Sequence, residues 1–243
     1  MQKHRFVLET QMRSGTHYLL FALRVAYRPV ILWPLRNGDV RELLDEDLSD
    51  GLRGREELSS KELSNTEPVA LVEILFRHYY HQLNVDPSFR FSKKVALISY
   101  PFDSFFSDGV VFSSETYTKT SSSTRPEARD YVLKHGSTEW KFLYPYMQKN
   151  ARWLEAIAKA REENTLVVRF EDLIDSFAPQ RDRIVNFLEI KPQQNFPEPV
   201  FNRERSYWKG DLLHKFDRKA LEAMTATFAR SLSQFYPERS TSI

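Results

Sequence analysis

Residues 6–20, FVLETQMRSGTHYLL, carry the clearest structural pattern in the sequence. It begins with an apolar run whose length suits a buried strand, turns through small and hydroxyl residues, and continues in a helical pattern. A strand that turns tightly into a helix forms an anion site, because the free backbone N–H groups and the helix dipole both favour negative charge there. Arg13, Ser14 and Thr16 add donors suited to a phosphate or a sulfate. The stretch therefore predicts that an anionic group is held at this turn.

The composition indicates a soluble globular protein. The chain has 243 residues, of which 41% are hydrophobic and 28% charged, and this length suits one α/β domain. A net charge of +2 is too small to argue for nucleic-acid binding. The absence of cysteine excludes disulfides, thiolate metal sites and a cysteine nucleophile, and it fits a reducing compartment. Neither a transmembrane segment nor a signal peptide is recognisable, so we expect a cytoplasmic protein.

Strand patterns alternate with helix patterns along the rest of the chain. Apolar runs predict strands at 29–34, 94–101 and 164–170, and residues 69–80 are also apolar and partly β-branched. Helical spacing occurs in three further segments. One is residues 140–162, the second begins near Pro179, and the third ends at Pro237. Residues 35–68 are interpreted as a long connection with one or two short surface helices, and 113–129 as a surface loop. The alternation predicts one three-layer α/β domain over residues 1–243, with a mostly parallel sheet covered on both faces.

The opening turn lacks the signatures of two common nucleotide sites. A nucleoside-triphosphate P-loop needs Lys and Ser/Thr after its second glycine, whereas Gly15 is followed by Thr16 and His17. The glycine triplet of a dinucleotide-binding turn is also missing. What remains is a basic residue followed by Ser-Gly-Thr at a strand-to-helix turn.

The run RSGTHYL, residues 13–19, resembles the phosphosulfate-binding loop of the sulfotransferases that use 3′-phosphoadenosine 5′-phosphosulfate (PAPS). Its Gly-Thr-His-Tyr-Leu part is most similar to bacterial enzymes that sulfate lipo-oligosaccharide signals. The resemblance implies a P-loop NTPase-like sulfotransferase fold, with PAPS as co-substrate, 3′-phosphoadenosine 5′-phosphate (PAP) as product and no metal. It also implies that the cofactor is held by Arg13, Ser14, Gly15, Thr16, His17 and Tyr18.

Three further segments follow in the order of that family. Residues 95–107 are similar to the strand and helix that hold the 3′-phosphate, with Ser107 in place and Ser99 where the family has arginine. One hydroxyl there replaces a bidentate guanidinium contact. In the next segment, residues 166–173, Phe170 takes the place of a tyrosine near the adenine. The last segment, residues 203–209, resembles the one that closes over the nucleotide in that family. This resemblance implies cofactor contacts from Arg203, Arg205, Trp208 and Lys209.

Sulfuryl transfer needs a base for the acceptor proton and positive charge on the leaving phosphate. Arg13 stays charged near neutral pH, so its predicted catalytic role is charge stabilisation. His78 lies upstream of the 3′-phosphate strand at about the family's spacing for its catalytic histidine, and it is the predicted base. His81 is the neighbouring alternative. Glu9 and Glu73 stay candidates, because some carbohydrate sulfotransferases use a carboxylate.

The sequence therefore predicts an enzyme that moves the sulfuryl group of PAPS to a hydroxyl or amine of an acceptor. A carbohydrate or glycolipid acceptor is favoured by the character of the opening loop, and residues 35–68 and 113–129 are expected to form its entrance. Two alternatives stay open. One is a sulfotransferase-fold binding module without activity, which Ser99 favours. The other is a nucleotide kinase that binds ATP at the turn, against which the missing Gly-Lys-Ser/Thr counts.

Overall fold

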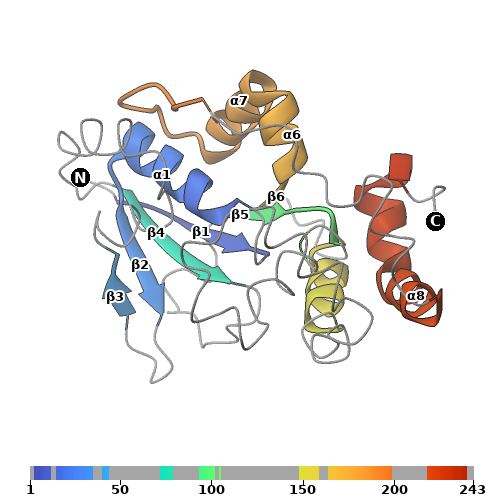
Figure 1. The fold of residues 1–243 in the computed structure, drawn as a ribbon. Coiled ribbons are helices and arrows are strands. Elements are labelled where there is room, and N and C mark those ends of the chain that lie inside the picture. Colours follow the sequence, from blue (N-terminus) through green and yellow to red (C-terminus); the bar gives the residue numbers. More distant parts are fainter. Residues whose placement is uncertain are drawn as a thin grey trace, which may run out of the picture. The chain divides into compact units, whose positions relative to one another are not determined.

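A mostly parallel sheet forms the centre of the compact unit made of residues 1–98 and 161–201 (Figure 1). Its strand order is β3-β2-β4-β1-β5-β6. In this computed structural model β1 pairs in parallel with β4 and β5, β2 with β4, and β5 with β6, whereas β3 is antiparallel to β2. The strands are β1 (His4–Thr10), β2 (Val30–Pro34), β3 (Val40–Glu42), β4 (Val72–His78), β5 (Lys93–Ile98) and β6 (Thr165–Arg169).

The structure describes residues 3–11, 15–34, 40–43, 72–78, 93–101, 104, 148–158, 164–198 and 218–239. These residues belong to two compact units. The first comprises residues 1–98 and 161–201, and the second comprises residues 99–160 and 202–243. The prediction that residues 1–243 form one domain stays a prediction. None of the helices in the described ranges is long and apolar enough to cross a membrane.

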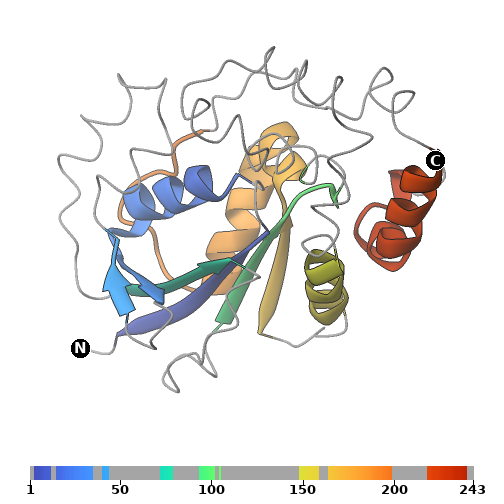
Figure 2. The ribbon, with the colours of Figure 1, turned by 60° about the horizontal axis from the view of Figure 1, so that its bottom comes forward.

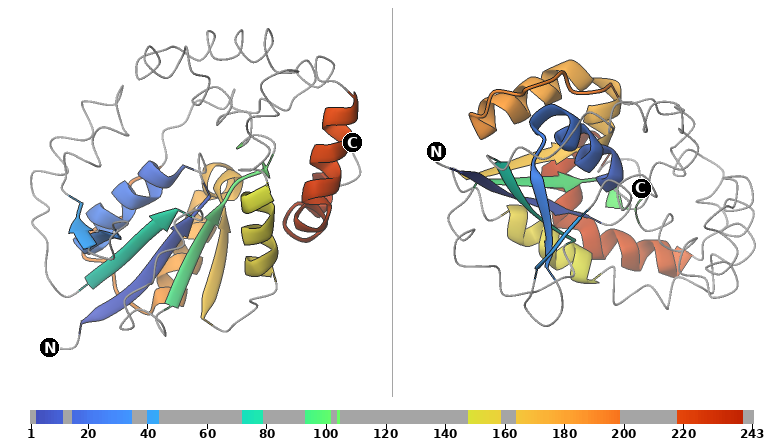
Figure 3. Two further views of the ribbon diagram at one scale, coloured as in Figure 1. Left: turned by 90° about the horizontal axis from the view of Figure 1, so that it is seen from below. Right: turned by 90° about the vertical axis from the view of Figure 1, so that its left-hand side faces the viewer.

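Three helices of the first unit cover one face of the sheet. They are α1 (Thr16–Tyr27), α6 (Phe170–Asp175) and α7 (Phe177–Leu188). Successive residues of a strand point to opposite faces, so Phe6 and Leu8 of β1 join the core beneath α1 while Val7 joins a separate cluster. Ile74 and Phe76 of β4 contribute to the same core as Phe6. Figures 2 and 3 show α1 and α7 on this one side of the sheet.

The described part of the second unit is helical. Residues 148–158 form one helix and α8 (Arg218–Phe235) another, followed by the short helix η4 (Pro237–Arg239). Gln234 Nε2 donates to the carbonyl oxygen of Ala158 at 3.2 Å. The rings of Tyr100 and Tyr236 meet edge-on at 5.2 Å. These contacts join the two helices and the chain that follows β5 within this unit.

The predicted α/β class with a mostly parallel sheet flanked by helices is confirmed. The predicted strands at 29–34, 94–101 and 164–170 correspond to β2, β5 and β6. The interpretation of residues 35–68 as a connection with short helices missed β3, whose residues 40–42 are all exposed. An edge strand without a buried face has no apolar alternation to reveal it. The rest of that connection and the predicted loop at 113–129 lie outside the described residues.

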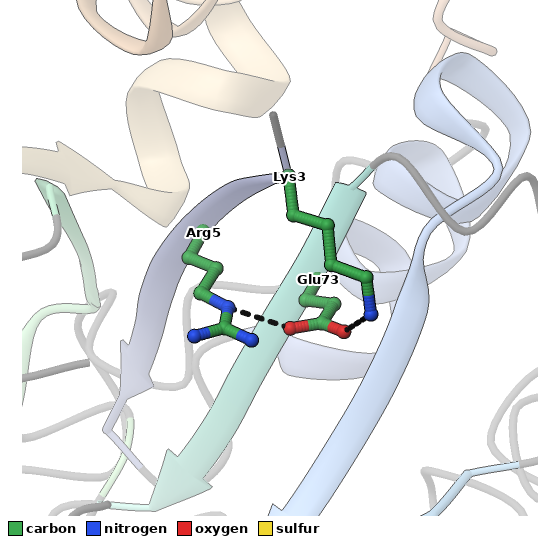
Figure 4. Close-up of polar contacts among 3 residues, drawn as sticks. All are labelled: Lys3, Arg5 and Glu73. Carbon is green, nitrogen blue, oxygen red and sulfur yellow. Dashed lines mark hydrogen bonds and ion pairs between the residues drawn. The ribbon is translucent and has the colours of Figure 1, made fainter. Parts of the chain in front are cut away.

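The far end of the sheet from the opening turn carries an ion-pair cluster on β1 and β4. The Glu73 carboxylate accepts from Lys3 Nζ at 2.5 Å and from Arg5 Nε at 2.7 Å (Figure 4). Burial alone would raise the pKa of Glu73. The hydrogen bonds and charges of Lys3 and Arg5 outweigh this effect and hold its pKa below the ordinary value of 4.5.

We expect Glu73→Gln to flatten the acid side of the stability profile. A carboxyl whose folded pKa is lowered adds stability above its unfolded pKa and loses it as the pH falls through the folded value. The free energy of unfolding of the parent chain should therefore fall more steeply than that of the variant below pH 4.5. At neutral pH the variant should lose about 1 kcal/mol or less, because Lys3 and Arg5 are partly exposed. Urea unfolding at several pH values measures this.

Glu42→Gln is the matched control, since Glu42 is an exposed carboxylate on the edge strand β3. Its profile should follow that of the parent chain. Parallel profiles for the parent chain and Glu73→Gln would show that the cluster does not contribute to acid sensitivity.

Candidate functional site

The opening turn joins the C-terminal end of the central strand β1 to the first turn of α1. Thr10 ends β1, the backbone N–H of Gln11 still donates to Leu97 of β5 at 2.9 Å, and Gly15 is the residue before α1. Arg13 and Ser14 lie outside the described residues. In open α/β sheets, ligands bind beyond the carboxyl ends of the strands. The turn therefore has the position that the predicted anion site requires.

Gly15 has a backbone conformation and a neighbour that both require glycine. Its φ is 76°, in the left-handed region that side chains with a Cβ rarely adopt. A Cβ built on Gly15 would lie 2.0 Å from Cε2 of Phe170. The ring of Phe170, the first residue of α6, therefore packs directly against the turn. Phe170 is buried, so its side chain supports the turn from the protein interior.

The first turn of α1 has features that suit an anion. The N–H groups at the start of an α-helix have no acceptor within the helix. The N-cap residue of α1 is Gly15, which has no side chain to cap them, and the first turn carries no acidic residue that would repel a negative charge. Thr16 is buried and His17 is exposed. Of these two predicted cofactor contacts, only His17 has its side chain at the surface of the first turn.

Tyr18 belongs to the core in this structure. Its side chain is buried, and its hydroxyl donates to the carbonyl oxygen of Pro197 at 2.9 Å. At the other end of α1, the N–H of Gln193 donates to the Ala26 carbonyl oxygen at 2.7 Å. Residues 193–197 therefore run along α1 from its last turn back to its first.

His78, the predicted base, ends β4 directly beside the end of β1. It is the register partner of Thr10, and its Nδ1 lies 2.9 Å from the Thr10 hydroxyl oxygen. The Thr16 hydroxyl donates to the same oxygen at 3.0 Å. Trp33 and Phe76 meet the imidazole edge-on, with ring centroids 5.6 and 5.1 Å away. The predicted base and the first turn of α1 are therefore joined by two hydrogen bonds.

The two candidate carboxylates are placed less favourably for the role of base. Glu73 is the register partner of Arg5. It lies five residues before His78 on β4, so the two residues are about 17 Å apart along the strand. Glu9 precedes Thr10 and points to the opposite face of the sheet. Its two oxygens lie 3.0 Å from Arg77 Nη2 and 3.3 Å from Lys94 Nζ. Both carboxylates thus take part in ion pairs, which favours His78 over either of them.

The remaining predicted site residues are not gathered at the turn by any described contact. Ser99 is buried and is the first residue of the second unit. His81, Ser107, Arg203, Arg205, Trp208 and Lys209 lie outside the described residues. Their roles stay predictions. Within the described ranges, no three His, Asp or Glu side chains form a group that could hold a metal ion.

Thr10 is the residue of this site that sequence reasoning missed. A threonine at the end of an apolar strand resembles any strand terminus. Its pairing with His78 joins residues 68 positions apart, and no local pattern records such a contact. The available signal is indirect, because both residues end strands of a predicted parallel sheet, and such ends meet at one edge.

Comparisons with known proteins give similarities in structure only. No family model matches the chain, and no curated protein matches it in sequence. A mouse sulfotransferase, SULT7A1, solved with PAP, is 16% identical with a TM-score of 0.49, over 96% of this chain and 84% of its own. A sulfotransferase from Alicyclobacillus acidocaldarius is 13% identical with a TM-score of 0.48, over 98% and 96%.

A retinol dehydratase solved with androsterone and the inactive cofactor PAP is also similar. It is 14% identical with a TM-score of 0.46, over 96% of this chain and 81% of its own. These proteins are sulfotransferases or are solved with PAP. At such identities the residues of this chain, and not the similarities, must carry an assignment of function.

Proposed function

We propose that the chain binds PAPS at the opening turn and transfers its sulfuryl group to an acceptor hydroxyl or amine. The observation that carries this proposal is the hydrogen-bonded connection from the first turn of α1 through Thr10 to His78. It joins the predicted phosphosulfate loop to the predicted base, two features that lie in segments far apart in the sequence. A base beside an anion site is the arrangement that transfer of a sulfuryl group needs.

Each residue of the proposed site has a separate role in the transfer reaction. The acceptor oxygen forms a bond to sulfur as the bond from sulfur to the 5′-phosphate oxygen breaks, and the electron pair of that bond stays with PAP. His78 takes the proton of the acceptor hydroxyl. Arg13, together with the N–H groups of the turn, stabilises the negative charge that develops on the leaving phosphate. Arg13 keeps its proton throughout, because a guanidinium is not a proton donor near neutral pH.

The features of the turn support a phosphosulfate as its ligand. Gly15 lets the backbone approach an anion closely, and the first turn of α1 contains no acidic residue. The proposed contacts of Arg203 and Arg205 with the 3′-phosphate rest on the resemblance alone. A carbohydrate or glycolipid acceptor and a cytoplasmic location rest on the sequence alone.

Radiolabelled PAPS, screened against glycan, lipid and phenol acceptors, tests the proposed activity. Transfer of label to at least one class is expected. Absence of both transfer and PAP binding would overturn the proposal, and magnesium-dependent ATP binding would instead favour a nucleotide kinase. PAP binding without transfer to any acceptor would favour a binding module.

Arg13→Ala should abolish sulfate transfer while the fold persists, because the leaving phosphate loses its main positive charge. We expect a loss of at least 10²-fold, the order of effect seen when one electrostatic donor is removed from an active site. Arg41→Ala is the control, since Arg41 is an exposed arginine on the edge strand β3. Transfer rates and far-ultraviolet circular dichroism of both variants measure this. Equal transfer rates for the two variants would remove Arg13 from the mechanism.

A further inference from the structure

A buried carboxylate on β1 connects the three central strands of the sheet. Glu9 is buried, and its two oxygens face different neighbours. One oxygen lies 3.0 Å from Arg77 Nη2 of β4, and the other lies 3.3 Å from Lys94 Nζ of β5. Because β4 and β5 flank β1 in the sheet, one side chain joins β1 to both of its neighbours. It does so one residue before the end of β1, close to the opening turn.

The ion pair between Glu9 and Arg77 lies one register position before the contact of the predicted base. Glu9 is the register partner of Arg77, and Thr10 is the register partner of His78. Successive residues of a strand point to opposite faces of a sheet. The ion pair therefore joins β1 and β4 on one face, and the contact between His78 and Thr10 joins them on the other.

Burial distinguishes this ion pair from one at the surface. The side chains of Glu9 and Arg77 are 7% and 17% exposed. Among the residues that the structure describes, Nε of Arg77 has no hydrogen-bond partner, and its guanidinium forms an ion pair with Glu9 alone. Water screens such a pair less than it screens an exposed pair, so its charges interact more strongly. Glu9 is therefore the group that holds the Arg77 side chain against β1.

A second cluster of the same kind lies at the opposite end of the same two strands. There the Glu73 carboxylate of β4 is held by Lys3 and Arg5 (Figure 4). Arg5 and Glu9 are four residues apart on β1, so they lie on the same face and about 13 Å apart along the strand. The two clusters share their chemistry and their face of the sheet, and they differ in their distance from His78.

We infer that Glu9 and Arg77 are positioning residues for His78. Their ion pair fixes the end of β4 against the end of β1, and it thereby holds the imidazole beside Thr10 and the opening turn. Lys94 holds the other oxygen of the same carboxylate from β5. Neither Glu9 nor Arg77 gives or takes a proton in this role. The inference rests on the proposed function, because it takes His78 as the base.

Amide hydrogen exchange measures the pairing of β1 and β4 without substrate. Arg77→Gln removes the ion pair between the two strands and leaves Glu9 paired with Lys94. The amides of both strands near His78 should then exchange about tenfold faster, because local opening becomes easier. Arg77→Lys keeps the positive charge and should retain most of the protection. Arg5→Gln is the matched control, and it should speed exchange only near Glu73.

Transfer kinetics, with the acceptor that yields product in the screen, test whether this position matters for the reaction. Arg77→Gln should lower kcat about tenfold, because a displacement of 1 Å can cost about 10²-fold. PAP affinity should persist, and Arg77→Lys should restore most of kcat. Arg5→Gln should transfer at the parent rate. A merely structural role would lower stability in Arg77→Gln and Arg5→Gln alike and leave kcat of the folded proteins unchanged.

A double-mutant cycle on kcat separates positioning from direct chemistry. If Glu9 and Arg77 act through their ion pair, Glu9→Gln, Arg77→Gln and the double variant should lose kcat by similar factors, because the second change removes an interaction already lost. A double variant whose loss is the product of the two single losses would overturn the inference. Glu9→Gln leaves a buried arginine without its counter-ion. If it does not fold, Arg77→Gln and Arg77→Lys decide.

Failure of this inference can be distinguished from failure of the proposed function. Parent kcat in Arg77→Gln overturns the inference whatever the exchange rates, even if the chain binds PAP and transfers sulfate. Parent exchange rates near His78 in that variant also overturn it. A chain that neither binds PAP nor uses PAPS overturns the proposed function instead, whereas faster exchange confined to the His78 end would still support the role of the ion pair in fixing β4.

Discussion

Gly15→Ala should disrupt the opening turn and lower the stability of the whole chain. Two costs add at this position. A residue with a Cβ in the left-handed region costs about 1–2 kcal/mol, and the new methyl group would lie 2.0 Å from Cε2 of Phe170. Overpacking of this kind costs about 1–3 kcal/mol. We expect a loss of about 2–5 kcal/mol in the free energy of unfolding, together with loss of PAP binding.

A double-mutant cycle with Phe170 separates the two costs. Phe170→Leu removes part of the ring that the new Cβ would meet. If the contact is the larger cost, Gly15→Ala should destabilise the Phe170→Leu background by about 1–3 kcal/mol less than it destabilises the parent chain. Urea unfolding of the four proteins measures this. A purely additive cycle would mean that the backbone conformation alone causes the loss.

His78→Gln should abolish most of the transfer activity and leave PAP binding nearly unchanged. General-base catalysis contributes about 10²–10⁴-fold to a rate, so we expect kcat to fall by that factor. The nucleotide affinity should persist, because the proposed contacts of PAP come from the turn and not from His78. Calorimetric titration with PAP and transfer kinetics with PAPS measure the two effects separately.

His4→Gln provides the matched histidine control. His4 is exposed at the opposite end of β1 from Thr10, so neither kcat nor PAP affinity should change. A His78→Gln variant that transfers at the parent rate would exclude His78 as the base. His81, which lies outside the described residues, would then be the next candidate from the sequence.

Local sequence pattern predicts the elements that meet at the candidate site. The apolar run at 6–8 and the helical spacing after Gly15 correspond to β1 and α1, and Gly15 directly precedes α1. Strand periodicity and helix periodicity are properties of neighbouring residues, and each of these elements forms from a continuous segment. The fold class follows from the alternation of such segments.

The contacts that make the site chemically specific depend on residues far apart in the chain. His78 contacts Thr10 because β4 and β1 are neighbours in the sheet. The order of the strands in a sheet cannot be predicted from the local sequence of each strand. Phe170 supports Gly15 because β6 ends on the same side of the sheet as β1. The resemblance to PAPS-dependent enzymes suggests an adenine contact for Phe170. In the structure its buried ring packs against the turn, and the adenine contact stays a prediction.

Tyr18 shows how a residue within a recognised motif can have a structural role. The resemblance implies a contact with the cofactor, but helical spacing also places Tyr18 on the face of α1 that covers the sheet. Its burial and its hydrogen bond to Pro197 follow from that face. A motif records which residues occur together, whereas the direction of each side chain depends on the packing of its helix.

Calorimetric titration of the parent chain with PAP is the decisive experiment for a nucleotide site at the opening turn. We expect saturable binding at one site, and we expect Gly15→Ala to lose this binding while Arg41→Ala keeps it. Because PAP is the expected product, the measurement does not depend on knowing the acceptor. If the folded chain gives no heat of binding at millimolar PAP, the opening turn is not a PAPS site.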